Sequence, residues 1–438
     1  MKFAGRLPLA CGALVVGMLP AGSPAAELSY GVDAGLGYDD NVTRVSTDQQ
    51  ADTIATIGAQ LRLDHESRRI KAKIASRLEY HDYLDGTYQS DVVGNLIGTS
   101  TFDLVPERFT WALDDTFGQS TVDQFAADTP ANRENINVFS TGPDFKLPLG
   151  SRNFLVIGGR YTDVSYESSQ LGNNRVEGQV ALQRDLSDAS VVSLNATTEQ
   201  VRFDDENQYP DFDRNEAYLG YTLNVARTDL TLEGGATEIR QDSATNDDWL
   251  GRLKISRKAS AALTVGAELG HEFADAGNTF VREQAQQPGS TDPVYVQQIA
   301  TPFVNEYVEV YANYVRNRTD LDLRLGMHDE TYDTLPLYNR RRLEVDLGVE
   351  RTVAPNLAAH VYANYSHSDY PKLDRQFSDL TATLGVNWQI GRLTSVDINY
   401  TFVDRNDDGA PDYSSNQLWI RIGYLVGEGV GSGPSRGL

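Results

Sequence analysis

Apolar and polar residues alternate strictly along the stretch Leu380–Ile390, where every second residue is apolar. The same alternation resumes over Ser395–Val403, after the two-residue turn Gly391-Arg392. A period of two indicates a strand with one apolar and one polar face. A run of about ten residues is what a tilted strand needs to cross the hydrocarbon core of a bilayer. This stretch is therefore predicted to be a transmembrane β-hairpin.

The same pattern recurs in twenty runs along the chain, and no segment shows sustained helical periodicity. The runs are Leu28–Tyr38, Thr53–Leu63, Ile70–Tyr80, Asp91–Leu104, Arg108–Phe117, Asn135–Leu147, Asn153–Ser165, Arg175–Asp185, Val191–Phe203, Asn215–Val225, Leu230–Ile239, Asp248–Arg257, Leu263–Phe273, Asn305–Val315, Asp320–His328, Arg342–Thr352, Leu357–Ser366, Leu380–Ile390, Ser395–Val403 and Gln417–Val426. Pro143 interrupts the sixth run, since proline cannot donate to a strand ladder. The sequence predicts an all-β fold, a transmembrane antiparallel up-and-down β-barrel of 20 strands, with 18 as the nearest alternative count.

The connections between these runs are predicted to alternate strictly between short and long. Short connections are Val105–Glu107, Pro148–Arg152, Ser187–Ala189, Ala226–Thr228, Lys258–Ser260, Arg316–Arg318, Ala354–Pro355 and Gly391–Arg392. Long, polar and acidic connections are Asp39–Asp52, Gln119–Glu134, Asp204–Arg214, Ala274–Val304, Glu330–Arg341, His367–Gln376 and Asp404–Asn416. Outer-membrane barrels have short periplasmic turns and long outer loops. Both ends of an even-stranded barrel reach the same rim, so both termini are predicted to be periplasmic.

The polar faces of the predicted strands carry charges of both signs, as at Lys71, Arg77 and Glu79. A narrow, dry barrel could not bury so many ions, whereas about twenty strands leave a water-filled lumen. The residues predicted to line the lumen and the solute path are Asn387, Gln389, Asn399, Thr401, Arg324, Glu344, Tyr307, Tyr311 and Tyr362. The alternative for the three tyrosines is packing in an aromatic girdle or at a rim.

The first residues have the form of a secretory signal peptide. Lys2 and Arg6 precede the apolar run Leu7–Leu19, and small residues follow up to Ala26. Such a run is too short for a membrane helix. The predicted organisation is a signal peptide over residues 1–26, an outer-membrane barrel over 27–426 and a short tail over 427–438. The only cysteine, Cys11, lies in the signal peptide, so the mature chain has no thiol or disulfide chemistry.

The predicted mature chain is strongly acidic. Without Lys2 and Arg6 it carries 36 Lys and Arg against 62 Asp and Glu, a net charge of −26. This balance argues against nucleic acid as a partner. No later apolar run approaches the roughly 18 residues of a membrane helix.

One segment matches the opening of a calcium-binding loop. Asp404, Asn406 and Asp408 occupy ligand positions one, three and five, followed by Gly409 at six and Asp412 at nine. Position twelve is a serine rather than the usual glutamate, and strands flank the segment instead of helices. The alternatives are a weak Ca²⁺ site in an outer loop and a solvated acidic hairpin. No other cofactor is expected.

The six histidines are scattered along the chain, and no serine or second carboxylate completes a catalytic pattern with any of them. The sequence therefore predicts that the protein is not an enzyme. The connection Ala274–Val304 is long enough either to fold into the lumen as a constriction or to cover the outer mouth.

The run Gly37–Val42, with sequence GYDDNV, resembles the β-barrel porin 2 family of outer-membrane barrels. Members of that family are often associated with exopolysaccharide synthesis and export. The long barrel with short turns, acidic loops and no soluble periplasmic domain is also similar. One departure is that residues 427–438 follow the last strand, so the chain does not end on an aromatic strand residue.

The resemblance implies a channel that passes exopolysaccharide across the outer membrane of a Gram-negative bacterium. The expected partners are outer-membrane lipids, the transported polysaccharide or small solute, the barrel-assembly machinery and polysaccharide-export components. A diffusion porin for small solutes, favouring cations if the acidity reaches the constriction, is the first alternative. A surface structural or adhesion barrel is the second.

Overall fold

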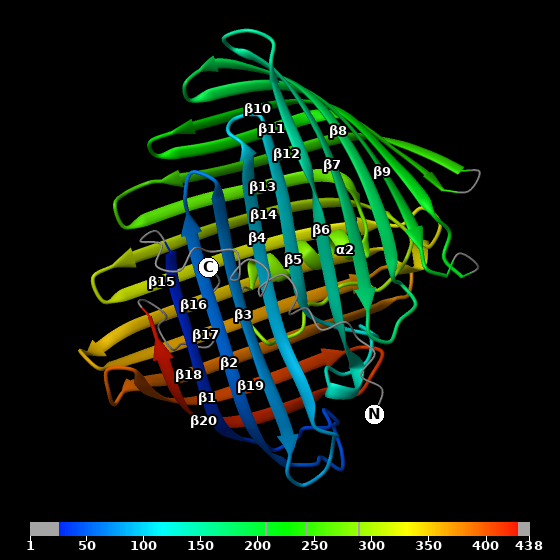
Figure 1. Ribbon diagram of the computed structural model, residues 1–438. Helices are drawn as coiled ribbons and strands as arrows, with labels where there is room; N and C mark the ends of the chain where they lie inside the picture. The colour runs from blue at the N-terminus through cyan, green and yellow to red at the C-terminus, as the bar shows by residue number, and fades with distance from the viewer. Residues whose placement is uncertain (1–25, 206–207, 242–243, 288–289, 428–438) are drawn as a thin grey trace.

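Twenty antiparallel strands form a closed barrel in the computed structural model (Figure 1). The structure describes residues 26–205, 208–241, 244–287 and 290–427. Each strand pairs with its neighbours in sequence, and β1 (Ala26–Asp39) also pairs with β20 (Tyr413–Val426), which closes the barrel. The predicted twenty-stranded up-and-down barrel is therefore confirmed.

The remaining elements follow the chain in order. The strands are β2 (Asp52–Glu66), β3 (Ile70–Tyr83), β4 (Asp91–Val105), β5 (Phe109–Thr121), β6 (Arg133–Pro148), β7 (Asn153–Tyr166), β8 (Asn173–Ser187), β9 (Ser190–Phe203), β10 (Phe212–Val225), β11 (Thr228–Gln241), β12 (Ala244–Lys258), β13 (Leu263–Ala274), β14 (Phe303–Arg316), β15 (Thr319–Thr331), β16 (Arg340–Ala354), β17 (Leu357–Tyr370), β18 (Arg375–Gln389) and β19 (Thr394–Asp407). Three short helices lie in connections: η1 (Pro130–Asn132), α2 (Ala276–Gln286) and η2 (Pro336–Tyr338).

The strands extend further toward the long-loop rim than their hydrophobic alternation does. β18 begins at Arg375 rather than Leu380, and β19 ends at Asp407 rather than Val403. The outward residues of these extensions are polar, such as Asp404 and Asn406. The alternation of apolar and polar residues therefore ends at the expected edge of the lipid, while the hydrogen-bonded pairing of the strands continues into water.

The two rims of the barrel differ as predicted over most of the wall, with two exceptions at the long-loop rim. Residues 371–374, between β17 and β18, are as few as in several short turns, and β11 ends at Gln241 only shortly before β12 begins at Ala244. The first residue of β1, Ala26, and the last residue of β20, Val426, both lie at the short-turn rim. The predicted signal peptide, apart from Ala26, and the predicted tail after Gly427 lie outside the described residues.

Pro143 locally interrupts the wall, as its sequence position predicts. The ladder between β6 and β7 skips from Thr141 paired with Tyr161 to Asp144 paired with Gly158. Arg160 bridges the gap, because its Nη1 donates to the Pro143 carbonyl oxygen at 3.3 Å and to Asp144 Oδ1 at 3.1 Å.

The outward face of the barrel is an apolar belt. Leu219, Leu384 and Ile420, on β10, β18 and β20, are 61%, 59% and 51% exposed. Soluble monomers rarely expose contiguous apolar surface on this scale. A closed barrel with such a belt satisfies every wall hydrogen bond internally and is the β-form that can span a membrane. None of the helices within the described residues is long and apolar enough to cross a membrane.

The facing of β18 gives a direct test of this arrangement. Leu384 points out of the barrel, whereas Thr383 points inward and its Oγ1 lies 2.9 Å from Thr401 Oγ1. Leu384→Arg is expected to destabilise the folded barrel by roughly 2–4 kcal/mol, because it places a charge in hydrocarbon. Thr383→Arg is expected to change stability little, because its guanidinium reaches the lumen. Urea unfolding of both variants in lipid vesicles measures the difference, and equal losses would contradict the assigned facing.

The connection after β13 contains a helix, α2, although the sequence shows no sustained helical periodicity there. The helix has a polar sequence, AGNTFVREQAQ, with a glycine in its first turn. Its stability comes from contacts with the barrel wall that local periodicity does not reveal.

Candidate functional site

A cavity of about 950 Å³ runs inside the barrel along β1–β3 and β18–β20. Its lining includes Arg392 and Thr394 at the short-turn rim and Arg44 and Asp128 at the long-loop rim. Between the rims the wall presents charged side chains, such as Arg77 and Glu79, together with a series of hydroxyl and amide groups. These include Thr381, Thr383, Asn387, Gln389, Asn399 and Thr401. The cavity is thus a hydrophilic space that touches both ends of the barrel.

The predicted lumen residues divide between two parts of the barrel. Asn387, Gln389, Asn399 and Thr401 all lie in the lining of this cavity. The other five lie on β14–β17 and are outside that lining: Arg324, Glu344, Tyr307, Tyr311 and Tyr362. Arg324 lies 3.8 Å from Glu309, and Glu344 lies 3.1 Å from Arg342.

The predicted lumen tyrosines pack against the wall. Tyr307 and Tyr311 face Gly270 and Gly266 of β13 across the ladder, and each ring lies over its glycine, where a Cβ would collide with it. Such aromatic–glycine pairs cover the backbone that glycine leaves open. Tyr307 also lies under the guanidinium of Arg282 from α2, 5.0 Å from its ring centre. This tyrosine therefore faces the lumen but is covered.

Charges in the cavity lining largely compensate one another. The lining contains six arginines and eight carboxylates. Arg77 Nη2 lies 2.9 Å from Asp33 Oδ1 and also pairs with Glu79, which Arg421 approaches to 3.5 Å. At the long-loop rim, Arg44 lies 2.8 Å from Asp39. The strong acidity of the whole chain is therefore not concentrated along this path.

Part of the outer lumen is occupied by residues 275–287 and 290–302, which we call the plug. Figure 1 shows α2 inside the ring of strands. The Arg342 guanidinium of β16 lies 2.8 Å from Glu283 in α2, and the Val294 amide donates to the Gln119 carbonyl oxygen of β5 at 2.8 Å. In the strand order β5 and β16 lie on opposite sides of the barrel. Of the two arrangements left open by the sequence, the structure therefore shows the inward one.

An ion pair holds the start of the plug to β8. Arg175 makes a two-pronged contact with Asp275, with Nη2 2.7 Å from Oδ1 and Nη1 2.9 Å from Oδ2. The same carboxylate caps α2, because it accepts a hydrogen bond from the Asn278 amide at 3.1 Å. Glu199 also lies 3.9 Å from Arg175. One arginine therefore fixes both the position and the first turn of α2.

The middle of the plug packs against β5–β7. Phe280 is fully buried with Ile136, Val138 and Val164 of the wall, together with Val294 and Val296 of the plug itself. Gln284 lies so close to Gly118 of β5 that any side chain at position 118 would overlap its amide. The absence of a side chain there permits this close approach.

Asp275 and Glu283 of the plug are held in the charged form. Burial alone would raise the pKa of Asp275, but Arg175, Arg214 and the Asn278 amide together lower that pKa below the usual value. For Glu283, burial is likewise opposed by nearby cationic groups, chiefly Arg342 and Arg282, which lower the pKa to about 2. Because these folded-state pKa values are lowered, the resulting stabilisation is present at neutral pH. It is lost as the pH falls through the lowered values.

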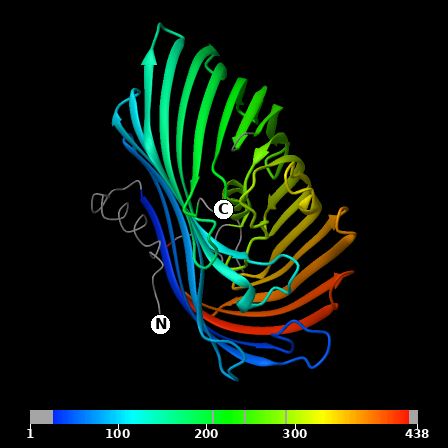
Figure 2. The ribbon, with the colours of Figure 1, turned by 90° about the vertical axis from the view of Figure 1, so that its right-hand side faces the viewer.

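A second inward segment, residues 122–132, crosses from β5 and β6 to β17–β19, and we call it the strap. Figure 2 shows it in teal, reaching toward the orange strands. Arg375 Nη2 donates to the Phe125 carbonyl oxygen at 3.1 Å, and Arg405 Nη2 donates to that of Gln124 at 3.0 Å. The Phe125 ring packs on Tyr370 with centres 4.8 Å apart and beneath Arg375 at 4.6 Å. The strap tip is therefore seated in a specific socket.

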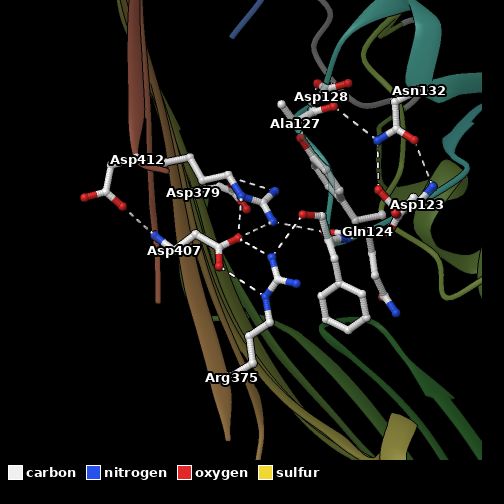
Figure 3. Close-up of polar contacts among 12 residues, drawn as sticks. Asp123, Gln124, Ala127, Asp128, Asn132, Arg375, Asp379, Asp407 and Asp412 are labelled. Atoms are coloured by element: carbon white, nitrogen blue, oxygen red, sulfur yellow. Dashed lines mark hydrogen bonds and ion pairs between the residues drawn. The ribbon is translucent and has the colours of Figure 1, made fainter. Parts of the chain in front are cut away.

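The base of the strap is closed by its own polar contacts. Figure 3 shows Asn132 next to Asp123, and Gln124 near Arg375 and Asp407. Asn132 accepts a hydrogen bond from the Asp123 amide at 2.9 Å and donates to the Ala127 carbonyl oxygen at 3.1 Å. Burial would raise the pKa of Asp128, but its pair with Arg133 lowers that pKa below the usual value. The strap and plug also touch, since Gln124 Nε2 lies 3.2 Å from Gln297 Oε1.

The GYDDNV run forms a clasp across the seam between β1 and β20. The Asn41 side chain is fully buried and donates to the carbonyl oxygens of Val45 at 2.8 Å and Ser414 at 2.9 Å. Asp39 accepts a hydrogen bond from Ser415 Oγ at 2.6 Å, and Asp40 accepts one from the Asn416 amide at 2.7 Å. The residues that carry the family resemblance thus have a structural role at the closure of the barrel.

Removal of this clasp is expected to weaken the seam. Asn41→Ala leaves the Ser414 and Val45 carbonyl oxygens without their donor and is expected to lower the unfolding free energy by about 1–3 kcal/mol. Urea titration of the folded form on unheated SDS gels measures the loss. Asn406→Ala is the control, because Asn406 is exposed and donates only to Asp404, and it is expected to change stability by less than about 0.5 kcal/mol. An equal effect of both substitutions would contradict the clasp.

The four candidate calcium ligands do not share one loop. Asp404 and Asn406 belong to β19, which continues to Asp407, and Asn406 Nδ2 donates to Asp404 Oδ2 at 2.9 Å. Asp412 Oδ1 instead accepts a hydrogen bond from the Asp407 amide at 2.8 Å, and Asp408 follows the end of the strand. Among the described residues no group of three His, Cys, Asp or Glu side chains is placed to hold a metal. The geometry therefore gives calcium binding here no support.

Sequence reasoning did not identify the residues that hold the plug and strap. Arg175, Arg342 and Arg375 lie near strand ends at the long-loop rim, where an inward-pointing arginine in a polar stretch is the only signal. Their partners are distant in sequence: Asp275 is 100 residues from Arg175, so no local pattern connects them.

No protein-family model matches the chain, and no curated protein sequence matches it. Solved structures with a similar course of the chain include the siderophore receptor PirA from Pseudomonas aeruginosa, at 10% identity and a TM-score of 0.45, covering 92% of this chain and 81% of that one. A mutant of the ferric enterobactin receptor PfeA from the same organism has 8% identity and a TM-score of 0.46, covering 91% of this chain and 80% of that one. The iron transporter FrpB from Neisseria meningitidis has 8% identity and a TM-score of 0.44, covering 91% of this chain and 81% of that one. The assignment as an outer-membrane type of β-barrel with a polar lumen therefore rests on the strand pairing and the apolar belt described above.

Proposed function

We propose that the barrel passes an uncharged, hydrophilic polymer, an exopolysaccharide, across the outer membrane through the cavity along β1–β3 and β18–β20. The observation that carries this proposal is the lining itself, whose hydroxyl and amide groups extend between rims that both contribute to the cavity. In the proposed orientation of the barrel in the outer membrane, the short-turn rim faces the periplasm and receives the polymer from polysaccharide-export components. The resemblance of residues 37–42 to exopolysaccharide-associated barrels supports the same substrate class.

The side chains of the cavity lining favour movement of the polymer over tight binding of it. Thr383, Asn399 and Thr401 can exchange hydrogen bonds with successive sugar hydroxyls, so no single position holds the chain tightly. The pairs Arg77–Asp33 and Arg44–Asp39 reduce the field that an ion would feel. A neutral polymer needs no charge selectivity, and this lining offers little.

A diffusion porin for small solutes is the second candidate, favoured by the cavity reaching both rims without any rearrangement. Because positive and negative charges in the cavity lining largely balance, we expect weak ion selectivity rather than the cation preference suggested by the total charge of the chain. The size of the solute therefore distinguishes the two functions better than its charge does.

The test combines deletion with a steric block. Deleting the gene is expected to abolish surface polysaccharide staining. Thr401→Trp, which narrows the cavity, is expected to reduce staining strongly, whereas Tyr400→Trp, on the outward face of the same strand, is expected to leave it unchanged. Unchanged staining after deletion, together with free conduction of small ions by the purified barrel in planar bilayers, would assign the protein as a porin instead.

A further inference from the structure

The two rims of the barrel carry opposite charge. The nine short turns contain seven arginines and two carboxylates. The described residues of the long connections contain sixteen carboxylates and only three basic residues. The seven turn arginines are Arg68, Arg69, Arg108, Arg152, Arg227, Arg318 and Arg392. A chain with a large excess of acid therefore has one distinctly basic end.

These seven arginines are free to bind an external group. All seven are exposed, and none forms a salt bridge with another described residue. The arginines at the long-loop rim behave differently, because Arg44, Arg133 and Arg375 each pair with a carboxylate. The basic rim is therefore not needed to neutralise the fold's own acidic residues.

The position of the arginines matches the edge of the apolar belt. Outward-facing apolar residues end the strands just before the turns, and an arginine follows within three residues. This is seen at two turns, where Val105 precedes Arg108 and Val225 precedes Arg227, with both valines exposed. The arginines occupy six of the nine short turns and so are distributed around the whole circumference. A ring at the edge of a lipid-facing belt fits a planar surface better than a single docked protein.

We infer that this ring binds the phosphate groups of anionic phospholipids in the leaflet at the short-turn rim. A guanidinium matches phosphate with two parallel hydrogen bonds, and basic residues at a membrane edge are attracted to anionic headgroups. The acidic opposite rim repels the same headgroups. The charge distribution therefore orients the barrel and adds a specific lipid contact, independently of the solute that it conducts.

The test uses a variant that removes the charge without touching the cavity. Arg69, Arg152, Arg227 and Arg318 are changed together to glutamine; none of them lines the cavity. Phosphatidylglycerol and phosphatidylcholine are titrated separately onto the purified full-length barrel, and bound lipids are counted by native mass spectrometry. The unaltered barrel is expected to retain several-fold more phosphatidylglycerol than phosphatidylcholine, and the variant is expected to lose this preference.

Two controls make the outcome specific. The same four positions changed to lysine are expected to keep most of the preference, and Lys372→Gln, an exposed cation on the opposite rim, is expected to keep all of it. Far-UV circular dichroism and the shift of the folded form on unheated gels check the fold of each variant. Equal phosphatidylglycerol binding by the glutamine variant would overturn the inference. So would binding of a soluble acidic polysaccharide, such as alginate, that displaces the lipid and depends on the same four arginines, because the ring would then be a polymer-capture site.

Discussion

Arg175→Met is expected to release the plug from β8 and to destabilise the docked state by about 3–5 kcal/mol, the usual cost of leaving a buried partner charge unpaired. Arg175 is 4% exposed and makes both prongs of the contact with Asp275. Methionine fills a similar volume but cannot neutralise Asp275 or Glu199. The N-terminal cap of α2 weakens at the same time, because Asp275 loses the group that positions it.

Hydrogen exchange of the α2 amides measures this effect, since exchange reports the free energy of local opening. Protection of the helix is expected to fall by two orders of magnitude or more, while the wall strands remain protected. Arg240→Met provides the matched control: Arg240 is an exposed arginine paired with Glu238 at 2.7 Å, and surface pairs of this kind contribute roughly 0–1 kcal/mol. Full retention of α2 protection in the Arg175 variant would show that the ion pair does not hold the plug.

Replacing residues 276–301 with a short glycine–serine linker is expected to convert the narrow cavity into a wide pore. The plug contacts opposite walls through Glu283 and Val294, and its removal joins the existing cavity to the lumen beside β5–β16. A barrel of about twenty strands without internal filling encloses an aqueous channel. Single-channel conductance in planar bilayers is therefore expected to rise roughly several-fold, since the conducting cross-section grows.

A shortened outer loop is the control for this deletion. Residues 86–89 lie between β3 and β4, outside the cavity lining. Replacing them with a shorter segment is expected to leave the conductance near that of the unaltered barrel. Unchanged conductance after removal of the plug would mean that the strap alone sets the constriction. In that case the strap socket of Phe125, Tyr370 and Arg375 would be the element to alter next.

The sequence was sufficient for the wall of the barrel because the wall obeys a local rule. Leu384 faces out and Thr383 faces in for the same reason that any strand alternates, so parity alone placed Asn399 and Thr401 in the lumen. The rule fails at the long-loop rim, where the outer face of β18 and β19 is polar and the inner face is covered by the strap. Hydropathy no longer marks the strand there, although the ladder continues to Asp407.

The interior could not be derived in the same way. The amino-acid pattern of α2 is too polar and too short to indicate a stable helix, and its stability depends on Arg175 and Arg342. Those contacts join segments that are 100 and 59 residues apart. Periodicity identifies which residues face inward, but it does not reveal which side of the lumen is filled. For that reason Tyr307 and Thr401, both predicted from the alternation to face inward, lie in different surroundings: Arg282 of α2 lies over Tyr307, and Thr401 lines the cavity.

The clasp at the seam also constrains the order of events during biogenesis. Asp39, Asp40 and Asn41 are made among the first residues of the barrel, yet their partners Ser414–Asn416 are made among the last. Contacts between such distant segments form late, because the loop that separates them must close first. A chain truncated before β20 would keep three polar side chains at the edge of β1 without their partners on β20. The clasp therefore couples the burial of these first-strand side chains to the completion of the last strand, so that only a chain that includes β20 satisfies them.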